Sequence, residues 1–463
     1  MIADLNPYPD YKESGSKWLG LVPTKWEVRN LRTLISKRSE RDRVDLPLLS
    51  VAREKGVFVR SLTDADENHN VIPEDLSNYK VARAGNLVIN KMKAWQGSMG
   101  IAPCDGIVSP AYYVFDFRIA NHAFGQKLLR SKPYVAHFGQ ASDGVRVGQW
   151  DLSIPGMRQI PVLLPPPQEQ AAIVRFLDWA NGRLDRAIRA KRKVIALLNE
   201  QKQAIIHRAV TRGLDPSVSL KPSGIPWLGD IPQHWTLKRF KFLATINSGQ
   251  VDPRKAEYRD LVLIAPNHIQ SGSGRLLKQE TAEEQGADSG KYLVRRGQVI
   301  YSKIRPNLRK AAIAPCDCLC SADMYPIDPT TEELSNNYLL LLLLSQAFTK
   351  FAVDTSMRVA MPKVNREALA SCWMWYPGAN EQSLILEFIA REGAPIDAAT
   401  SRLEREIELL REYRTRLVAD VVTGKLDVRA AVAKLPEETQ SRIAEDEVDL
   451  EGETEVVDEE AAV

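Results

Sequence analysis

The chain has 463 residues, of which 44% are hydrophobic and 26% charged, the ordinary composition of a soluble globular protein with two to four domains. No apolar run approaches the ~20 residues that a membrane-spanning helix needs, which excludes an integral membrane protein. The net charge of +3 is the sum of two unlike regions: residues 436–463 have a net charge of −11, and the other residues have a net charge of +14. A basic body suggests a polyanionic partner such as nucleic acid, although an ordinary soluble surface explains the charge equally well.

The chain opens on a Trp-rich segment, SGSKWLGLVPTKW at 14–26, which returns as SGIPWLGDIPQHW at 223–235. Each copy holds two tryptophans, Trp18 and Trp26 in the first and Trp227 and Trp235 in the second. We expect their rings to pin this irregular segment against its globule, since a buried Trp supplies a large contact area. Base stacking is the weaker alternative, because the bases of a duplex are already stacked.

Short apolar runs and Gly-rich turns after the opening segment predict a mixed α+β globule. LVINKM at 87–92 has the pattern of a strand, and HAFGQKLLRS at 122–131 that of a helix. The same two patterns recur in the second half as QVIYSKI at 298–304 and NNYLLLLLLSQAFTKF at 336–351.

From Glu169 to Arg212 the sequence holds no proline and only one glycine, and its apolar residues fall near a 3.5-residue period. That period predicts a long helix with a coiled-coil seam. Uninterrupted over 44 residues, such a helix would be roughly 66 Å long. Residues 183–212 carry nine Lys or Arg against two Asp or Glu.

Longer blocks recur at a constant offset. RAGNLVINKMKAWQGSMGIAPCDGIVSP at 83–110 aligns with RRGQVIYSKIRPNLRKAAIAPCDCLCSA at 295–322. PPPQEQAAIVRFLDWANGRLDRA at 165–187 aligns with PGANEQSLILEFIAREGAPIDAA at 377–399, again 212 residues away. A period this long indicates a duplicated domain with its connector rather than a solenoid repeat.

The duplicated helix contains Gly393 and Pro395 near its start, so we expect a short helix, a break and then a long helix. Residues 395–424 carry five Lys or Arg against six Asp or Glu. Packing the two helices together would bury both seams, and the charge difference favours this pair over self-association. The alternative is that each helix packs on its own globule. An antiparallel pair would hold two globules a fixed distance apart, as two half-sites on B-DNA require.

Chemistry-bearing motifs are missing from the sequence. CDCLC at 316–320 predicts buried strand cysteines rather than a metal site, because no second Cys or His pair at zinc spacing accompanies it. The chain has no methyl-donor loop with an Asn/Asp-Pro-Pro-Tyr/Phe stretch, no phosphate loop, and its only Glu-x-Lys lies in the predicted helix. We therefore predict no catalytic residue, metal or cofactor on this chain.

Together these motifs resemble the specificity subunits of type I restriction–modification enzymes. The resemblance rests on SGIPWLGDIPQHW, on PPPQEQAAI and NEQSLILEFI at the helix starts, and on RAVTRGLD and DVVTGKLD at the helix ends, and it covers about residues 5–430. The first opening segment departs slightly, and the second helix start lacks the Pro run. The resemblance implies an α+β fold: two pseudo-symmetric α/β target-recognition domains separated by two long conserved helices packed as an antiparallel coiled coil.

The implied organisation has five parts. They are a first target-recognition domain at 1–165, a central spacer helix at 166–213, a second target-recognition domain at 214–376, a distal spacer helix at 377–430, and an acidic tail at 431–463. We expect the tail to be disordered because it is strongly charged and poor in apolar residues.

By resemblance, the chain is a non-catalytic subunit that reads a bipartite DNA target, one half with each domain. The implied partners are double-stranded DNA, two methylation subunits and two restriction subunits, with S-adenosylmethionine, ATP and Mg²⁺ bound on those subunits. The implied role is phage defence in the cytoplasm, and neither a secretory signal nor a disulfide pattern contradicts this. Two alternatives are a DNA-reading adaptor of another defence assembly and a pseudo-dimeric protein scaffold.

Candidate DNA contacts are polar or basic residues near Gly-flanked loops, since these types read base edges or bind phosphates. In the first domain they are Arg53, Lys55, Lys91, Lys93, Gln96 and Arg146. In the second they are Asn267, His268, Lys303, Arg305, Asn307, Arg309, Arg358 and Lys363. The alternative for any one of them is a solvated surface residue. The seam residues expected to pack the helix pair are Ile188, Ile195, Leu198, Leu410 and Leu417, and the outer helix faces are expected to meet the protein partners.

Overall fold

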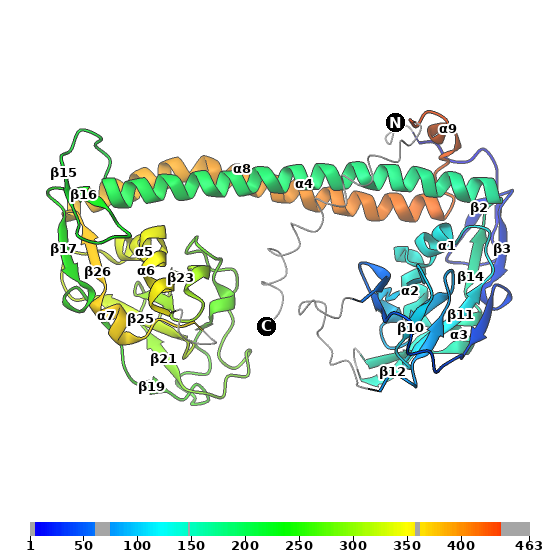
Figure 1. Cartoon of the computed structure of the whole chain (residues 1–463), viewed down its shortest axis with the longest axis horizontal. Helices are drawn as coiled ribbons and strands as arrows, with labels where there is room; N and C mark the ends of the chain where they lie inside the picture. Colours follow the sequence, from blue (N-terminus) through cyan, green and yellow to red (C-terminus); the bar gives the residue numbers. More distant parts are fainter. Residues whose placement is uncertain (1–4, 61–74, 147–148, 357–361, 437–463) are drawn as a thin grey trace. The chain divides into compact units, whose positions relative to one another are not determined.

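The computed structural model describes residues 5–60, 75–146, 149–356 and 362–436. They fall into two compact units (Figure 1). The first comprises the chain up to Lys191 and the segment from Glu404, and the second comprises Arg192–Leu403. Each unit contains one globule and a part of both long helices, α4 (Pro167–Arg212) and α8 (Ala379–Val422).

The globule of the first unit is built on an antiparallel sheet. In spatial order its strands are β4 (Ile35–Arg38), β11 (Tyr112–Phe117), β8 (Leu87–Asn90) and β9 (Met99–Ile101). Strand β8 was predicted from the LVIN run, and all four of its residues are buried. Because side chains alternate along a strand, Leu87 and Ile89 enter one apolar cluster and Val88 another. A continuous apolar run therefore means that both faces of the sheet are covered.

One face of this sheet is covered by α1 (His122–Leu129) and α2 (Lys132–Gln140), and the other by short strands. The short antiparallel pairs are β1 (Tyr11–Glu13) with β2 (Leu21–Pro23), β3 (Glu27–Asn30) with β14 (Pro161–Leu164), β5 (Leu49–Ala52) with β6 (Gly56–Val59), β7 (Lys80–Ala82) with β10 (Gly106–Val108), and β12 (Ser142–Arg146) with β13 (Gln149–Leu152). The remaining short helices are η1 (Leu31–Thr33), η2 (Ala94–Gln96), α3 (Ile154–Arg158) and α9 (Arg429–Val432).

The second unit repeats this topology. Its sheet runs β18 (Ala244–Ile246), β25 (Met324–Pro329), β22 (Val299–Ser302) and β23 (Ala311–Ile313), in the order found for the equivalent strands of the first unit. Around it lie β15 (Leu220–Pro222) with β16 (Asp230–Pro232), β17 (Thr236–Arg239) with β26 (Trp373–Tyr376), and a sheet of β19 (Gln250–Val251), β21 (Lys291–Val294), β24 (Cys318–Cys320) and β20 (Leu263–Ile264). The short helices are η3 (Phe240–Phe242), η4 (Pro266–His268), η5 (Pro306–Leu308) and α7 (Arg366–Ser371). The predicted pair of pseudo-symmetric α+β domains is confirmed.

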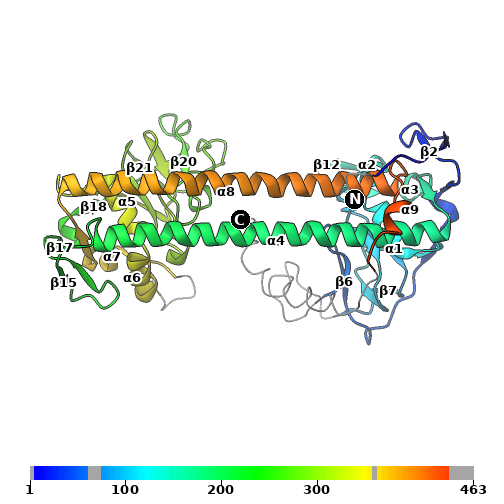
Figure 2. The same ribbon diagram turned by 90° about the horizontal axis from the view of Figure 1, so that it is seen from above.

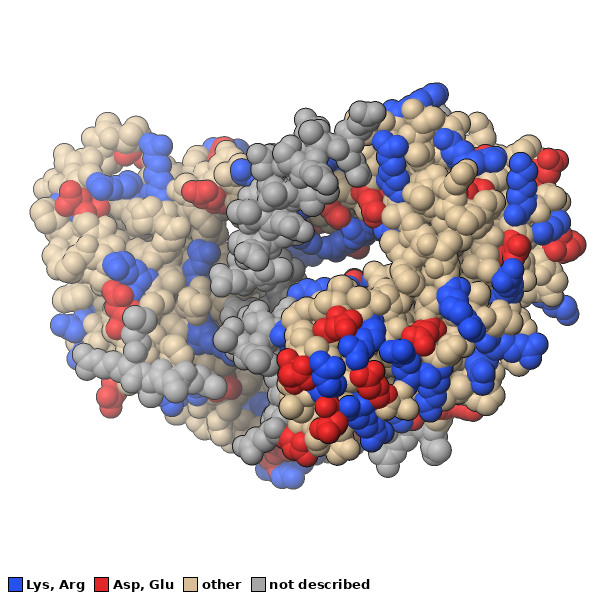
Figure 3. All heavy atoms as spheres, turned by 45° about the vertical axis from the view of Figure 1, so that its right-hand side comes forward, with Lys and Arg blue, Asp and Glu red and all other residues tan. Residues whose placement is uncertain are grey.

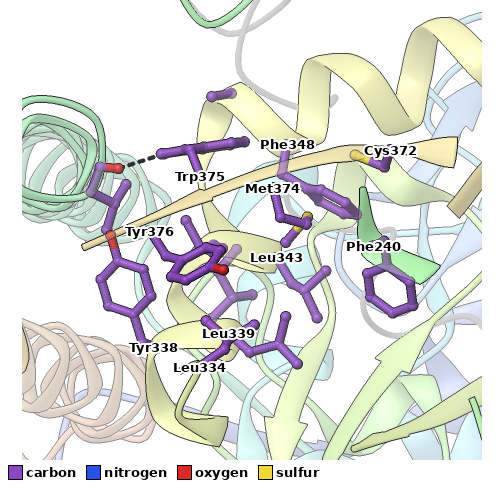
Figure 4. Packing of buried hydrophobic residues seen from close by; sticks show 14 of the residues in the cluster. Phe240, Leu334, Tyr338, Leu339, Leu343, Phe348, Cys372, Met374, Trp375 and Tyr376 are labelled. Atoms are coloured by element: carbon purple, nitrogen blue, oxygen red, sulfur yellow. Dashed lines mark hydrogen bonds between the residues drawn. The ribbon is translucent and has the colours of Figure 1, made fainter. Parts of the chain in front are cut away.

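The Leu-rich segment of the second unit forms the bent pair α5 (Asn336–Leu344) and α6 (Gln346–Ser356), not one helix over 336–351. Ser345 divides them, because its backbone is extended and its hydroxyl accepts the N–H of Phe348, which caps α6. Leu339 and Leu343 are buried beside β26 (Figure 4). From the same strand, Trp375 donates its indole N–H to the carbonyl of Val210 on α4 at 2.6 Å, which fastens the globule to the helix.

In each unit α4 and α8 lie side by side (Figure 2). In the first unit Asp185 pairs with Arg414, and Lys191 with Glu406. In the second unit Lys202 Nζ lies 2.6 Å from Asp397 Oδ1. Partner numbers fall along α8 as they rise along α4, so the helices are antiparallel, as predicted. Of the expected seam residues, Ile188 and Leu417 are buried, whereas Ile195, Leu198 and Leu410 are half-buried.

The expected break in the distal helix is wrong, because α8 continues through Gly393 and Pro395. Pro395 removes the N–H that would bond the carbonyl four residues earlier. The helix nevertheless continues because its apolar side packs on α4: Ile385 and Ile389 share one apolar cluster with Val210. Packing of an amphipathic face commonly outweighs a local propensity of this kind.

No single helix in the described ranges is long and apolar enough to cross a membrane. The bent pair α5–α6 has the length and apolar composition of a membrane span only when its two helices, which are bent by 62° relative to each other, are taken together. Cys318 and Cys320 are buried in β24, as the CDCLC pattern predicted, and burial raises the pKa of Cys318 to about 12. The described residues contain no cluster of His, Cys, Asp and Glu that could hold a metal ion.

Candidate nucleic-acid interface

The structure places a short 3₁₀ turn after the central strand of each globule. Turn η2 follows β8, and turn η5 follows β22, 212 residues later. Each turn ends on a residue with left-handed backbone, Gly97 in the first globule and Arg309 in the second. These turns carry several of the predicted DNA contacts, and we call them the first and second turns.

The first turn presents one exposed lysine next to an aromatic pair. Lys93 and Met92 are exposed, whereas Gln96 is half-buried. Trp95 donates its indole N–H to the carbonyl of Met92 at 3.1 Å, and its ring lies 5.2 Å from that of Trp150 between centroids. A Trp pair beside a lysine offers both an apolar surface and a cation, two features with which proteins contact DNA.

Lys91 lies just before this turn and has a carboxylate partner. Its ammonium group lies 2.8 Å from Asp151 Oδ2 on β13. The hydrogen bond to Asp151 raises the pKa of Lys91. Figure 3 shows Lys and Arg side chains spread over the forward face of the first unit, with Asp and Glu between them. Lys91 itself is paired with an acidic side chain, so its charge is partly neutralised within the protein.

The second turn presents two exposed residues that can read bases. Arg305 and Asn307 are both exposed, and Pro306 between them is buried. The segment at 362–363 lies alongside, because Arg305 N–H bonds the Pro362 carbonyl at 3.0 Å and Lys363, which is exposed, forms a β-bridge with Ile304. The structure thus brings Arg305, Asn307 and Lys363 to one place.

The preceding Lys303 points back into its own globule. Its ammonium group donates to the Ala322 carbonyl at 2.6 Å and lies 5.5 Å from the centroid of the Tyr325 ring. These contacts leave it half-buried.

The other candidates of the first globule lie on the hairpin turn between β5 and β6. Arg53 and Lys55 are exposed there. The carbonyls of Arg53 and Glu54 accept hydrogen bonds from Arg130, at 2.7 and 2.6 Å. Arg130, which holds this hairpin turn in place, was not predicted, because nothing in the sequence pattern links it to the hairpin. Arg146 belongs to β12, and its side chain is not described.

Two of the remaining candidates of the second globule, His268 and Arg309, differ from the expectation of an exposed loop. Asn267 is exposed, but His268 is buried, with its ring Nδ1 3.1 Å from the Leu263 carbonyl. Burial lowers the pKa of His268. Arg309 is half-buried against α4, and Arg358 lies outside the described residues. A role in DNA contact stays a prediction for each of these residues.

The opening segments are fixed to the starts of the long helices. Trp26 donates its indole N–H to Glu169 Oε1 at 2.9 Å, and Tyr8 donates its hydroxyl to the same oxygen at 2.6 Å. Burial and this carboxylate raise the pKa of Tyr8. In the second unit Trp235 donates to Glu381 Oε1 at 3.1 Å. Trp26 and Trp235 are buried, which confirms the predicted anchoring role for these two rings, whereas Trp18 and Trp227 are half-buried.

The dipeptide Glu-Gln at each helix start contains a second tie. Gln170 accepts the N–H of Asn121 at 3.0 Å and donates to the Pro165 carbonyl. Gln382 likewise accepts the N–H of Ser335 at 3.0 Å and donates to the Pro377 carbonyl. The repeated EQ in the sequence was the signal for these contacts, but Asn121 and Ser335 lie 49 and 47 residues away from their glutamines in the chain.

Equivalent leucines on the long helices are exposed to the same extent. Leu197 on α4 and Leu409 on α8, 212 residues apart, are 56% and 57% exposed. In the first unit Leu409 lines a shallow hollow together with Tyr413, which is also exposed. The other residues lining the hollow are Lys191, Glu406, Leu410, Glu412 and Arg416. Large exposed apolar side chains rimmed by charge are typical of protein–protein contacts.

Residues 232–409, which include the second turn, match the family model of the type I restriction modification DNA specificity domain. Over these residues the chain is similar to the DNA specificity domain of type I restriction–modification systems. The EcoDI specificity subunit of Escherichia coli is 29% identical over 282 residues, which are 58% of this chain. The alignment spans 62% of the length of that relative.

A solved chain has a similar fold. It belongs to a structure concerned with complex assembly and conformational transition of the type I R-M system, and it superposes with a TM-score of 0.60 at 16% identity. The superposition covers 88% of this chain and 99% of that one. The HsdS subunit from Thermoanaerobacter tengcongensis aligns with a TM-score of 0.42 at 17% identity, over 88% of this chain and 98% of its own.

The specificity-domain match and the EcoDI relative confirm the predicted resemblance to specificity subunits. Subunits of this family are in general not catalytic and bind no cofactor themselves.

Proposed function

We propose that this chain is the DNA-recognition subunit of a type I restriction–modification system, and that it reads a bipartite target. One observation carries the proposal: the fold of the specificity domain occurs twice, with the same exposed turn after the same strand and different side chains on it. We take residues 1–165 and 214–376 as the target-recognition domains, 166–213 and 377–430 as the spacer helices, and 431–463 as the tail.

The exposed side chains of the turns suit DNA chemistry. Arg305 can bond both acceptors of a guanine in the major groove, and Asn307 can bond an adenine in the same bidentate way. Lys93 of the first turn suits guanine or a phosphate, and the neighbouring Trp pair suits apolar contact with a base edge. Because the two sets differ on a shared scaffold, we propose two different half-sites.

The catalytic steps then belong to partner subunits. We propose two methylation subunits that bind S-adenosylmethionine, and two restriction subunits that use ATP and Mg²⁺, acting with this chain in the cytoplasm. The matched exposure of Leu197 and Leu409 supports a partner that binds twice through the same kind of contact. A methylation subunit has to flip its target adenine out of the duplex, so this chain would place the partner's pocket over that base.

The first test is a salt series on duplex DNA with the full chain. A protein that contacts phosphates loses affinity with log K falling by about 0.9 per contact for each unit of log[salt]. A flat response would favour the protein scaffold over the DNA reader. Mapping methylated adenines in cells that carry this chain and its methylation partner would then separate the specificity subunit from an adaptor of another defence assembly, which leaves no methylation.

The second test is modularity. Residues 36–150 would be replaced by the equivalent segment of another specificity subunit, and the methylated sites mapped again. One half of the recognised sequence is expected to change while the other stays the same. A change in both halves would contradict the assignment of one half-site to each domain.

A further inference from the structure

Arg309, at the end of the second turn, is fastened to the spacer helix by a closed set of hydrogen bonds. Its guanidinium Nη1 donates to Gln203 Oε1 on α4 at 2.7 Å. Gln203 Nε2 in turn donates to the Gly272 carbonyl at 3.3 Å, and Gly272 N–H donates to the Arg309 carbonyl at 3.0 Å. Three segments far apart in the sequence thus meet in the second unit. We call this set the brace.

The backbone at this position suits glycine better than arginine. Arg309 has φ +47°, in the left-handed region that a Cβ disfavours. The equivalent position in the first turn is Gly97, with φ +89°. A Cβ on Gly97 would meet the side chain of Val135 at 3.1 Å, so the first turn ends against its own globule. Arg305 has the same left-handed backbone, with φ +46°, but is exposed, whereas Arg309 gains in the brace a side-chain contact that glycine cannot make.

The brace also fits closely around Gly272. A Cβ at Gly272 would lie 3.1 Å from Nη2 of Arg309, and Gly272 itself has φ +67°. Arg309 is half-buried here, whereas Arg305 and Asn307, a few residues before it, are exposed. The second turn thus has one end on the spacer helix and its candidate base-reading side chains on the surface.

We propose that Arg309 is a positioning residue rather than a DNA contact: through Gln203 it fixes the second turn to the spacer helix, and so sets where Arg305 and Asn307 meet the second half-site. This inference rests on the proposed DNA-reading function. It predicts that a residue on α4, Gln203, affects which bases the second domain accepts. The first half-site, whose turn ends in glycine, would not depend on such a brace.

The test compares Arg309→Gly, which copies the first turn, with Gln203→Ala. Binding of the full chain is measured on the recognised duplex and on single-base variants of each half-site. In both variants we expect the ratio of affinities for the recognised duplex and its single-base variants to fall roughly tenfold at the second half-site, because the turn is held less firmly. The same ratio at the first half-site should stay unchanged. The double variant should lose little more than either single one, because both remove the same contact. Gln201→Ala, at an exposed position on the same helix, is the matched control.

Salt dependence separates positioning from direct contact. With a positioning role, Arg309→Gly keeps the wild-type slope of log K against log[salt]. A slope reduced by about one would show a phosphate contact and overturn the proposal. If the Gln203→Ala variant discriminates bases at the second half-site as the wild type does, the positioning role is also overturned, while the proposed function stands. Wild-type chain that binds no DNA would instead overturn the proposed function. Circular dichroism of each variant shows whether it is folded, and Gln203→Ala leaves the turn's own sequence intact.

Discussion

The indole nitrogen of Trp26 lies 2.9 Å from Glu169 Oε1, and this hydrogen bond joins the opening segment to the N-terminal end of α4. The same carboxylate is buried and also accepts the Tyr8 hydroxyl. Trp235 and Glu381 repeat the arrangement in the second unit, where His234 Nε2 lies 2.7 Å from the other carboxylate oxygen. The repeated Trp segment and the repeated Glu-Gln dipeptide are therefore two sides of one contact, which holds each globule on its helix.

Removing the first carboxylate tests this contact. Glu169→Ala leaves two buried donors, those of Trp26 and Tyr8, without an acceptor. A hydrogen bond to a charged group is worth about 1.5–3 kcal/mol, so we expect a loss of that order in the free energy of unfolding. Urea unfolding followed by circular dichroism measures it. Glu169→Gln keeps one acceptor oxygen and should lose less. Equal losses for the two variants would show that the hydrogen bonds are not what matters.

Arg305 is the candidate whose role in base reading can be tested most directly. Arg305→Ala should weaken binding of the full chain to its recognised duplex. If Arg305 contacts a guanine, preference at one base pair of the second half-site relaxes by ~1–3 kcal/mol, and preference elsewhere stays. A uniform loss across sequences, with a smaller salt slope, would instead identify a phosphate contact. Competition binding with single-base variants measures the difference, and no loss of any kind would remove Arg305 from the interface.

The spacer helices offer a test of how the gap in a bipartite target is set. Lys193 on α4 lies just past Lys191, whose partner on α8 is Glu406. Inserting four residues after Lys193 and four after Glu404 adds about one turn to each helix and keeps the seams facing each other. At 1.5 Å per residue and 3.4 Å per base pair, the gap should lengthen by about two base pairs. Methylation mapping reads the gap directly, and an unchanged gap would show that the helices do not set it.

Sequence patterns predicted the elements whose signal is local and periodic. The LVIN strand and the long helices follow from apolar spacing and from the repeat itself, whereas the antiparallel pairing of the helices was implied by the resemblance to specificity subunits. The break at Pro395 was predicted wrongly, because a local rule about proline does not include packing of Ile389 on α4. Likewise Ser345 ends α5 through its own backbone and hydroxyl, which an apolar run conceals.

The candidate interface was predictable only in part. Arg305 and Asn307 are exposed in the second turn, as a Gly-flanked loop suggested. His268 and Arg309 were predicted as contacts for the same polar or basic character, yet His268 is buried and Arg309 is fastened to Gln203, 106 residues earlier. Residue type reveals what a side chain can bond, but only the fold decides whether DNA or the protein supplies the partner.

The equivalent leucines on the helices allow the partner surface to be tested one copy at a time. Leu409→Asp and Leu197→Asp each place a charge in an exposed apolar spot, so neither is expected to unfold the chain. If each leucine contacts one methylation subunit, each single variant should retain one copy and the double variant should retain none. Co-expression followed by mass measurement of the purified complex counts the copies. Leu384→Asp, on an exposed leucine of α8 at another position, is the control. Two copies bound to the double variant would place the docking surface elsewhere on the chain.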